Sequence, residues 1–174
     1  MVNDKLNKEL VSHMMDEAAW KELSKDYPWT EQLLEKYMNY VSWYEISENY
    51  DAVWTKSLGE KFRHNLDWHK LSLDCSPLLF TEDNIDTFKD YWDWKNLSYN
   101  SCIRLPPELL MKYADRWNWS NIINRHGNDA INFNEEFLEK IGEYIPVSEL
   151  GRSQLWYNII EQRKKHCNRQ YYLK

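Results

Sequence analysis

Residues 94–100 read WKNLSYN, and closely related segments occur at three other places in the chain. They are WKELSKD at 20–26, WYEISEN at 43–49 and WHKLSLD at 68–74. The shared motif is W-x-x-L/I-S-x-N/D, which WSNIINR at 119–125 continues more loosely and VSEL at 147–150 follows. Successive copies begin 23 to 28 residues apart. A period near 25 residues predicts a tandem-repeat architecture with about six repeats.

Apolar residues recur at fixed distances before the first residue of each copy, which we call the anchor. Ten positions before the anchors stand Leu10, Leu33, Leu58, Asn84, Leu109 and Phe137. Six positions before them stand Met14, Tyr37, Phe62, Phe88, Tyr113 and Ile141. Two positions before them stand Ala18, Val41, Leu66, Trp92, Trp117 and Ile145. A spacing of four residues keeps side chains on one helix face, so we expect a helix before each anchor.

Two sets of helix N-cap residues mark where helices begin. Thirteen positions before the anchors stand Thr30, Thr55, Thr81, Pro106 and Asn134. Immediately before the anchors stand Ser42, Asp67, Asp93 and Asn118. Each repeat is therefore expected to contain a long first helix and a short second helix that starts at the anchor.

These patterns predict an all-α fold, a short α-solenoid of about six helix–short-helix repeats that forms a single domain over residues 1–174. The anchors are Trp20, Trp43, Trp68, Trp94, Trp119 and Val147. A leucine-rich repeat is excluded because Lys95 and His69 stand where its strand needs apolar residues. The first and last copies should act as caps, and residues from Ser153 to about His166 should form a closing helix.

The amino-acid composition argues against several other classes of protein. Aromatic residues make up 16% of the chain, which argues against disorder, and only 4 of 174 residues are glycine. So few glycines disfavour phosphate-binding loops and all-β folds. Residues 1–15 lack the pattern of a secretory signal and no stretch is apolar enough to span a membrane, so we expect a cytoplasmic protein.

Neither a metal nor a cofactor is expected. The three cysteines, Cys75, Cys102 and Cys167, include no C-x-x-C pair. His64 and His69 are five residues apart, whereas a helical zinc pair needs four. Cys75 and Cys102 follow their anchors in comparable loops, which leaves a redox pair as a minor alternative.

The segments WDWKNLSYN and LDWHKLSLD resemble the short Trp-rich tandem repeats, W-x-x-L-S-x-N, of bacterial and large-virus proteins. The resemblance covers roughly residues 10–150 and supports the repeat architecture. No activity is attached to those repeats, so it implies no catalytic or binding residues. The motif is weaker in the last two copies, at Ile123, Arg125 and Val147.

The anchor tryptophans are interpreted as buried wedges between neighbouring repeats, because they recur in phase with the apolar positions. A ladder that stacks on bases or sugars is the alternative. The Ser and Asn/Asp that follow each anchor are expected to end the second helix by bonding to backbone groups.

Function is predicted by elimination as non-enzymatic binding of a protein partner, in the manner of an adaptor or an inhibitor or immunity-type protein. Residues 1–160 carry a net charge of −10, so a basic partner is favoured. Aromatic and histidine side chains outside the repeat positions are the candidate protein-binding residues: Tyr44, Trp54, His69, Tyr91 and Tyr99.

Two other classes remain. Residues 161–174 form a basic tail with a net charge of +4, which could bind nucleic acid through Arg163, Lys164, Lys165 and Arg169. An enzyme that uses Asp, His or Cys groups in a groove is the third class, and it requires a deep polar pocket.

Overall fold

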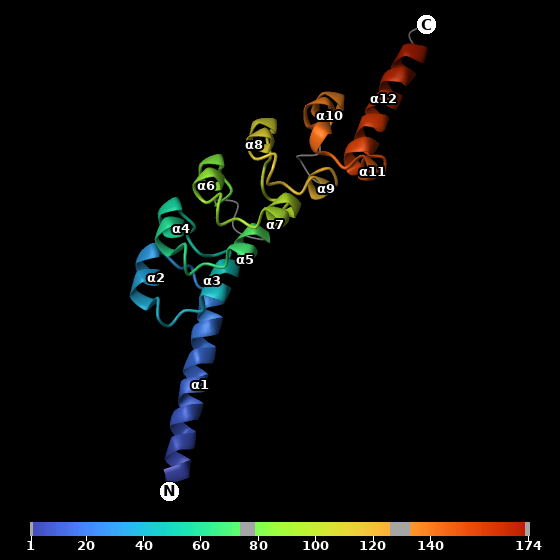
Figure 1. Cartoon of the computed structure of the whole chain (residues 1–174). Helices are drawn as coiled ribbons and strands as arrows, with labels where there is room; N and C mark the ends of the chain where they lie inside the picture. Colours follow the sequence, from blue (N-terminus) through green and yellow to red (C-terminus); the bar gives the residue numbers. More distant parts are fainter. Residues whose placement is uncertain (1, 74–78, 126–132, 173–174) are drawn as a thin grey trace. The chain divides into compact units, whose positions relative to one another are not determined.

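The computed structural model describes residues 2–73, 79–125 and 133–172 (Figure 1). All regular secondary structure in these ranges is helical. The fold is therefore an all-α helical-repeat solenoid, as the periodicity predicts. Its contacts divide the chain into two compact units, Met1–Trp92 (unit 1) and Asp93–Lys174 (unit 2).

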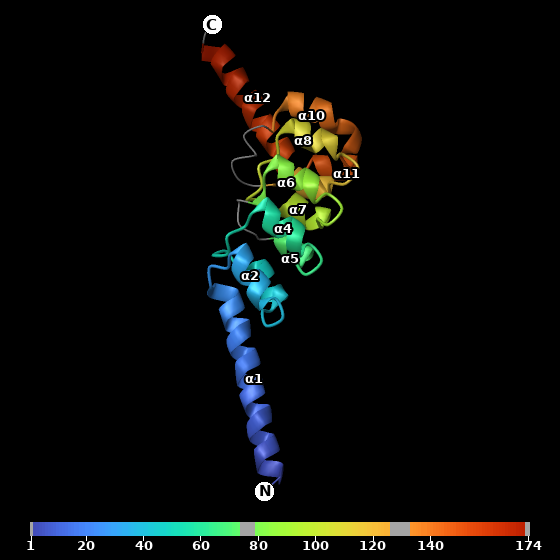
Figure 2. The same cartoon turned by 90° about the vertical axis from the view of Figure 1, so that its left-hand side faces the viewer.

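The described residues of unit 1 include one long α-helix and five short ones. The long helix is α1 (Val2–Asp26). The first helices of its repeats are α2 (Glu31–Tyr37), α4 (Lys56–Phe62) and α6 (Glu82–Thr87). The second helices are α3 (Trp43–Glu48) and α5 (Trp68–Leu73). Figure 1 shows α2, α4 and α6 as one layer, while α3 and α5 continue the line of α1 in the other, and Figure 2 looks onto the layer of α2, α4 and α6.

Unit 2 continues the same alternation. Its second helices are α7 (Trp94–Tyr99), α9 (Trp119–Ile122) and α11 (Val147–Leu150). Its first helices are α8 (Pro107–Lys112) and α10 (Glu135–Ile141), and the 3₁₀ turn η3 (Gly142–Tyr144) follows α10.

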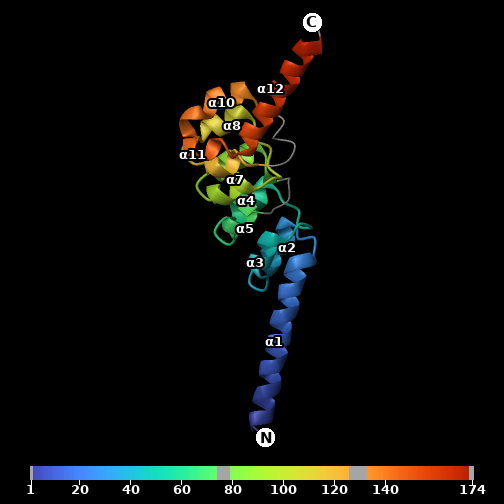
Figure 3. The same cartoon turned by 90° about the vertical axis from the view of Figure 1, so that its right-hand side faces the viewer.

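The predicted closing helix is α12 (Gln154–Tyr172), which ends unit 2 and extends past α10 (Figure 3). The Ser153 hydroxyl caps it by accepting from the backbone N–H of Trp156 at 3.1 Å. Leu155 and Ile159 of α12 are buried, and the Leu155 N–H donates to the Ile123 carbonyl at 3.0 Å. The helix thus covers the apolar end of the stack, as a terminal cap must.

The predicted N-caps are confirmed at both helices of the repeats. Side chains of Thr30, Thr55, Thr81 and Asn134 accept from a backbone N–H three residues later, whereas Pro106 makes no side-chain cap. Ser42, Asp93 and Asn118 cap the second helices in the same way. These bonds satisfy amide groups that have no partner inside such short helices.

The prediction of a long first helix is wrong. After α1, each first helix has only six or seven residues, and it ends at or just before the position six residues before the anchor. The next apolar position lies in the following turn, yet it is still buried, as at Leu66 and Trp92. Their N–H groups donate to the carbonyls of Phe62 and Phe88, four residues back. Because each of these bonds joins residues four apart, the turn keeps the next apolar side chain on the buried face after the helix has ended. The apolar spacing in the sequence is therefore the same as that of one long helix.

The first copy also differs from the predicted helix pair, because α1 runs without a break through Trp20. The residue before this anchor is Ala19, a strong helix former, whereas the later copies have an N-cap residue there. Leu10 and Met14, whose counterparts in the later repeats are mostly buried, are 60% and 58% exposed in α1. In the first copy, the end of α1 from Trp20 onward therefore takes the place of the second helix, and no separate first helix precedes it.

The anchor tryptophans lie between neighbouring repeats, as predicted, but only Trp68 and Trp119 are buried, whereas Trp20, Trp43 and Trp94 are half-buried. Each ring contacts the residue six positions before the next anchor, as in the pairs Trp20–Tyr37, Trp43–Phe62, Trp68–Phe88 and Trp94–Tyr113, whose ring centroids are 4.9 to 5.4 Å apart. Trp119 stacks on Tyr144 instead. Val147 has no following repeat to pack against and is 85% exposed, which explains why a small residue suffices there.

The repeated serines link one repeat to the next. The buried Ser47 hydroxyl donates to the Trp43 carbonyl at 2.7 Å and accepts from the Asp67 N–H at 2.8 Å. Ser98 makes the same pair of bonds to the Trp94 carbonyl and the Asn118 N–H. The predicted structural role of this position is confirmed, because each hydroxyl satisfies the backbone of two repeats.

Gly59 is required by close packing between α4 and the residue that ends α6. A Cβ placed on Gly59 would lie 2.7 Å from the ring of Phe88, which is 1% exposed. We expect Gly59→Ala to lower the free energy of unfolding by about 1–2 kcal/mol in urea denaturation, although alanine favours helix. Gly142→Ala is the control, because nothing lies within 4 Å of a Cβ there. An unchanged Gly59→Ala protein would contradict the tight contact.

Candidate protein-binding surfaces

A groove lies at the N-terminal end of unit 1, and we call it the end groove. It encloses about 610 Å³ and is lined by α1 and the turn after α2: Glu9, Ser12, His13, Asp16, Glu17, Trp20, Asn39 and Tyr40. Trp20 and Tyr40 stack at its base with ring centroids 5.2 Å apart and planes at 28°. Tyr40 is 62% exposed, so part of this aromatic pair faces solvent.

Charge in the end groove is mainly negative. Asp16 and Glu17 are adjacent in α1, Glu9 lies two turns before them, and all three side chains are exposed. His13 Nδ1 lies 3.5 Å from Glu17 Oε1, one turn apart on the helix. Carboxylates beside the faces of aromatic rings favour a cation, since both groups attract positive charge.

The end groove exists because the first repeat has no first helix. In the later repeats the position six residues before the anchor is buried between first helices, as at Phe62 and Phe88. Its counterpart in α2, Tyr37, is only half-buried and contacts Trp20 at 5.4 Å. The N-terminal end of the stack thus exposes aromatic surface that is buried at the corresponding positions of the later repeats.

Tyr44 and His69 lie on a second face of unit 1, each directly after the anchor of α3 or α5. Both side chains are exposed. Lys70 lies over the Tyr44 ring at 4.6 Å and forms an ion pair with Glu48. Hydrogen bonds to Glu48, and secondarily to Tyr44, raise the pKa of Lys70 above its usual value. A partner at Tyr44 would therefore have to displace or share this lysine.

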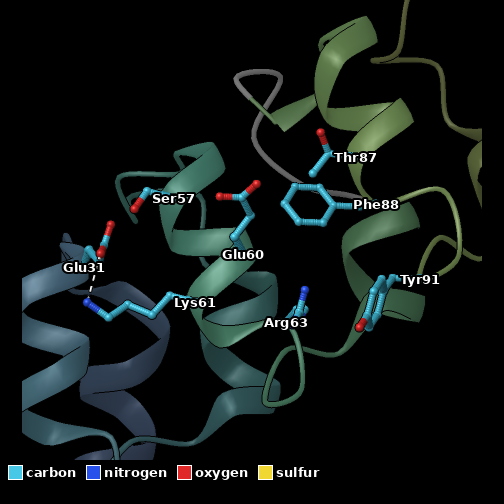
Figure 4. Close-up of a pocket in the computed structure, with 8 residues that line it drawn as sticks. All are labelled: Glu31, Ser57, Glu60, Lys61, Arg63, Thr87, Phe88 and Tyr91. Atoms are coloured by element: carbon cyan, nitrogen blue, oxygen red, sulfur yellow. Dashed lines mark hydrogen bonds and ion pairs between the residues drawn. The ribbon is translucent and has the colours of Figure 1, made fainter.

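A second hollow, the α4 groove, has a volume of about 550 Å³ beside α4 and contains the predicted residue Tyr91 (Figure 4). Ser57, Glu60, Lys61 and Arg63 lie on one side, Thr87, Phe88 and Tyr91 on the other, and Glu31 at the end.

Much of the charge in the α4 groove is already paired. Lys61 forms ion pairs with Glu35 and Glu31, which raise its pKa. Bonds from Ser57, and then from Lys61, lower the pKa of Glu31. Because both signs are present and partly paired, this groove selects a charged partner less strongly than the end groove.

Tyr91 belongs to a repeat position that the sequence analysis missed. Three residues before their anchors, Tyr40, Tyr91 and Tyr144 each pack against the preceding anchor tryptophan, at 5.2 to 5.3 Å between ring centroids. In the fifth repeat Arg116 takes this position, with its guanidinium 5.6 Å from the Trp94 ring. Aligning the residues three before each anchor would have revealed this position.

The remaining predicted protein-binding residues are Trp54 of unit 1 and Tyr99 of unit 2. Trp54 is only 3% exposed, and its indole N–H donates to the Asn49 carbonyl at 2.9 Å. Its assignment to an exposed binding face is therefore wrong, because it occupies a buried position shared with Trp29, fourteen residues before the anchor. Tyr99 is 71% exposed on α7 in unit 2. Within unit 1, Tyr44 and His69 occupy equivalent positions, each directly after an anchor, and both are exposed.

Two of the cations proposed for nucleic-acid binding are engaged with carboxylates. Arg163 forms two bonds to Glu135, which lower the pKa of that carboxyl. Lys164 pairs with Glu161 on the next turn of α12. Lys165 is exposed, and the side chain of Arg169 lies outside the described ones. Pairing lowers the positive charge that this tail offers to phosphates.

Cysteine thiols, metal-binding groups and membrane-spanning helices were the other features that the sequence raised. Cys102 and Cys167 are exposed free thiols, whereas Cys75 lies outside the described residues. No group of three His, Cys, Asp or Glu side chains suited to a metal ion occurs in residues 2–73, 79–125 and 133–172. Among the helices described, none has the length and apolar character needed to cross a membrane.

Comparisons of the chain with protein-family models, curated protein sequences and solved structures found no match. Functional inference consequently rests on the surfaces described above.

Proposed function

We propose that this protein is a non-enzymatic protein-binding module, an adaptor or an inhibitor or immunity-type protein that acts by covering the surface of a basic partner. The observation that carries the proposal is the end groove. It combines the half-buried Trp20 and the exposed Tyr40, which stack on each other, with three exposed carboxylates of α1.

The chemistry of the end groove defines what it would recognise. An arginine or lysine that enters could lie against Trp20 and Tyr40 while its charge meets Asp16 or Glu17. Arginine suits such a site best, because its planar guanidinium stacks on rings and bonds to carboxylates. Charge attraction would raise the rate of association and select basic surfaces over acidic ones.

Nucleic-acid binding through the basic tail is less well supported. Arg163 and Lys164 already have carboxylate partners within unit 2, and the net charge of the whole chain is −6. We therefore do not propose it as a second function.

Reversing two charges in the end groove tests the proposal. Tagged parent protein, the Asp16→Lys/Glu17→Lys variant and a control are used to purify partners from the native cell for quantitative mass spectrometry. The control is Glu139→Lys/Glu149→Lys, which makes the same charge change at two exposed positions of unit 2. We expect one partner with a basic surface to be recovered by the parent and the control, and at least about tenfold less by the groove variant.

Two results would count against the proposal. One is recovery of the same partner in equal amount by the Asp16→Lys/Glu17→Lys variant, since the groove would then be irrelevant. The other is that the parent enriches nothing beyond what the tag alone enriches.

A further inference from the structure

The N-terminal part of α1 exposes apolar side chains that nothing in the described chain covers. Leu10, Val11, Met14 and Met15 are 60%, 52%, 58% and 67% exposed. They occupy two successive turns and form one face of the helix, which Ala18 continues. We call these five residues the α1 apolar face.

The α1 apolar face lies on the opposite side of the helix from the end groove. The groove uses Glu9, His13, Asp16 and Trp20, which the helical repeat of 3.6 residues places about half a turn away. Every side chain from Lys8 to Ala19 is exposed. Figures 1 to 3 show this part of α1 extending away from the other helices of unit 1.

The exposed part of α1 gains no stability from packing within the described chain, and in proteins most helical stability comes from packing and not from intrinsic helix propensity. Most helices in proteins persist because an apolar face is buried against another element. Covering the α1 apolar face would therefore stabilise both the helix and whatever covers it.

The charges that flank this face indicate a second copy of the same chain. Lys8 and Glu22 are both exposed and lie fourteen residues apart, close to four helical turns, so they share one flank of the α1 apolar face. Two antiparallel helices related by a two-fold axis bring the same flank of each together. Lys8 of one copy then lies beside Glu22 of the other, twice in the pair, with Met15 near the axis.

We propose that the protein forms a homodimer in which the α1 apolar face packs antiparallel against the same face of a second copy. The contact is isologous and closed, so it ends at two chains. Both end grooves remain open on the outer sides of the paired helices. Dimerisation is independent of the proposed function and can be measured without a partner.

Sedimentation velocity of the intact chain over micromolar to submillimolar concentrations tests the proposal. We expect a concentration-dependent rise toward twice the chain mass of 21.3 kDa. Val11→Glu/Met15→Glu should remain monomeric, because it places four carboxylates in the contact. The controls Val53→Glu and Val147→Glu change residues that do not belong to α1 and are 48% and 85% exposed, and these variants should dimerise like the parent. Far-UV circular dichroism checks that each variant keeps its folded repeats.

A charge swap tests the antiparallel arrangement. Lys8→Glu and Glu22→Lys should each weaken dimerisation by roughly three- to tenfold, and the double variant should restore it. A parent that stays monomeric at the highest concentration, or a dimer that Val11→Glu/Met15→Glu leaves intact, overturns the proposal. Failure of the double variant to restore affinity overturns the antiparallel pairing.

Discussion

Trp68→Ala is expected to lower the free energy of unfolding by roughly 3–5 kcal/mol, one of the two largest losses predicted for this chain. Trp68 is 8% exposed and contacts three aromatic rings, those of Phe88, Tyr91 and Trp92, at 4.9 to 5.3 Å. Its indole N–H donates to the Arg63 carbonyl at 2.7 Å. Truncation would open a cavity between two repeats and leave that carbonyl without its bond.

Urea denaturation followed by circular dichroism measures this loss. Tyr157→Ala, at a side chain that is 61% exposed, is the matched aromatic control and should change stability by no more than about 0.5 kcal/mol. If Trp68→Ala unfolds like the parent but loses a partner, the anchors form a ligand ladder and the wedge interpretation is wrong.

Asn49→Ala is expected to lower the free energy of unfolding by about 2–4 kcal/mol, because this one buried side chain forms hydrogen bonds to four backbone groups. Its amide donates to the carbonyls of Ser24 and Tyr27, at 2.8 and 2.9 Å. Its oxygen accepts from the N–H groups of Asp51 and Ala52. Alanine would leave these groups unpaired in a site where Asn49 is 2% exposed.

The same denaturation experiment includes Asn65→Ala, an exposed asparagine, which should remain within about 0.5 kcal/mol of the parent. A loss below about 1 kcal/mol for Asn49→Ala would mean that water replaces its bonds, and that this position is not a link between repeats.

Arg125 shows how the repeat accommodates a departure from the motif. It occupies the position of Asn49 in the fifth copy and is 5% exposed. Its guanidinium donates to the Ser98 carbonyl at 3.4 Å and to the Ile103 carbonyl at 2.6 Å. Ser98 is the counterpart of Ser24, so a different side chain reaches the same backbone group of the preceding repeat. The motif alone could not reveal that Arg125 replaces Asn49 in this role. The replacement works because the long arginine side chain extends to the same carbonyl, although the residue types differ.

The sequence predicted the candidate binding surfaces less well than it predicted the fold. Trp54 and Tyr44 are both aromatic and both outside the motif, yet one is buried and the other 48% exposed. Residue type gives the same expectation for both, and only the packing of the first helices separates them. The end groove was missed for a related reason, because it joins Trp20 of α1 to Tyr40 in the turn after α2.

Local sequence determined the helices themselves. N-cap residues at fixed positions satisfy the first amides of each helix, and apolar side chains four residues apart supply one buried face, so period, class and helix starts are all encoded within about 25 residues. Tertiary structure alone decided which of those faces stay in water. Repeat 1 has no separate first helix, so Tyr37 is half-buried and the α1 apolar face is exposed. Whether an apolar side chain is buried depends on which helices pack against it, and its own residue type does not determine that.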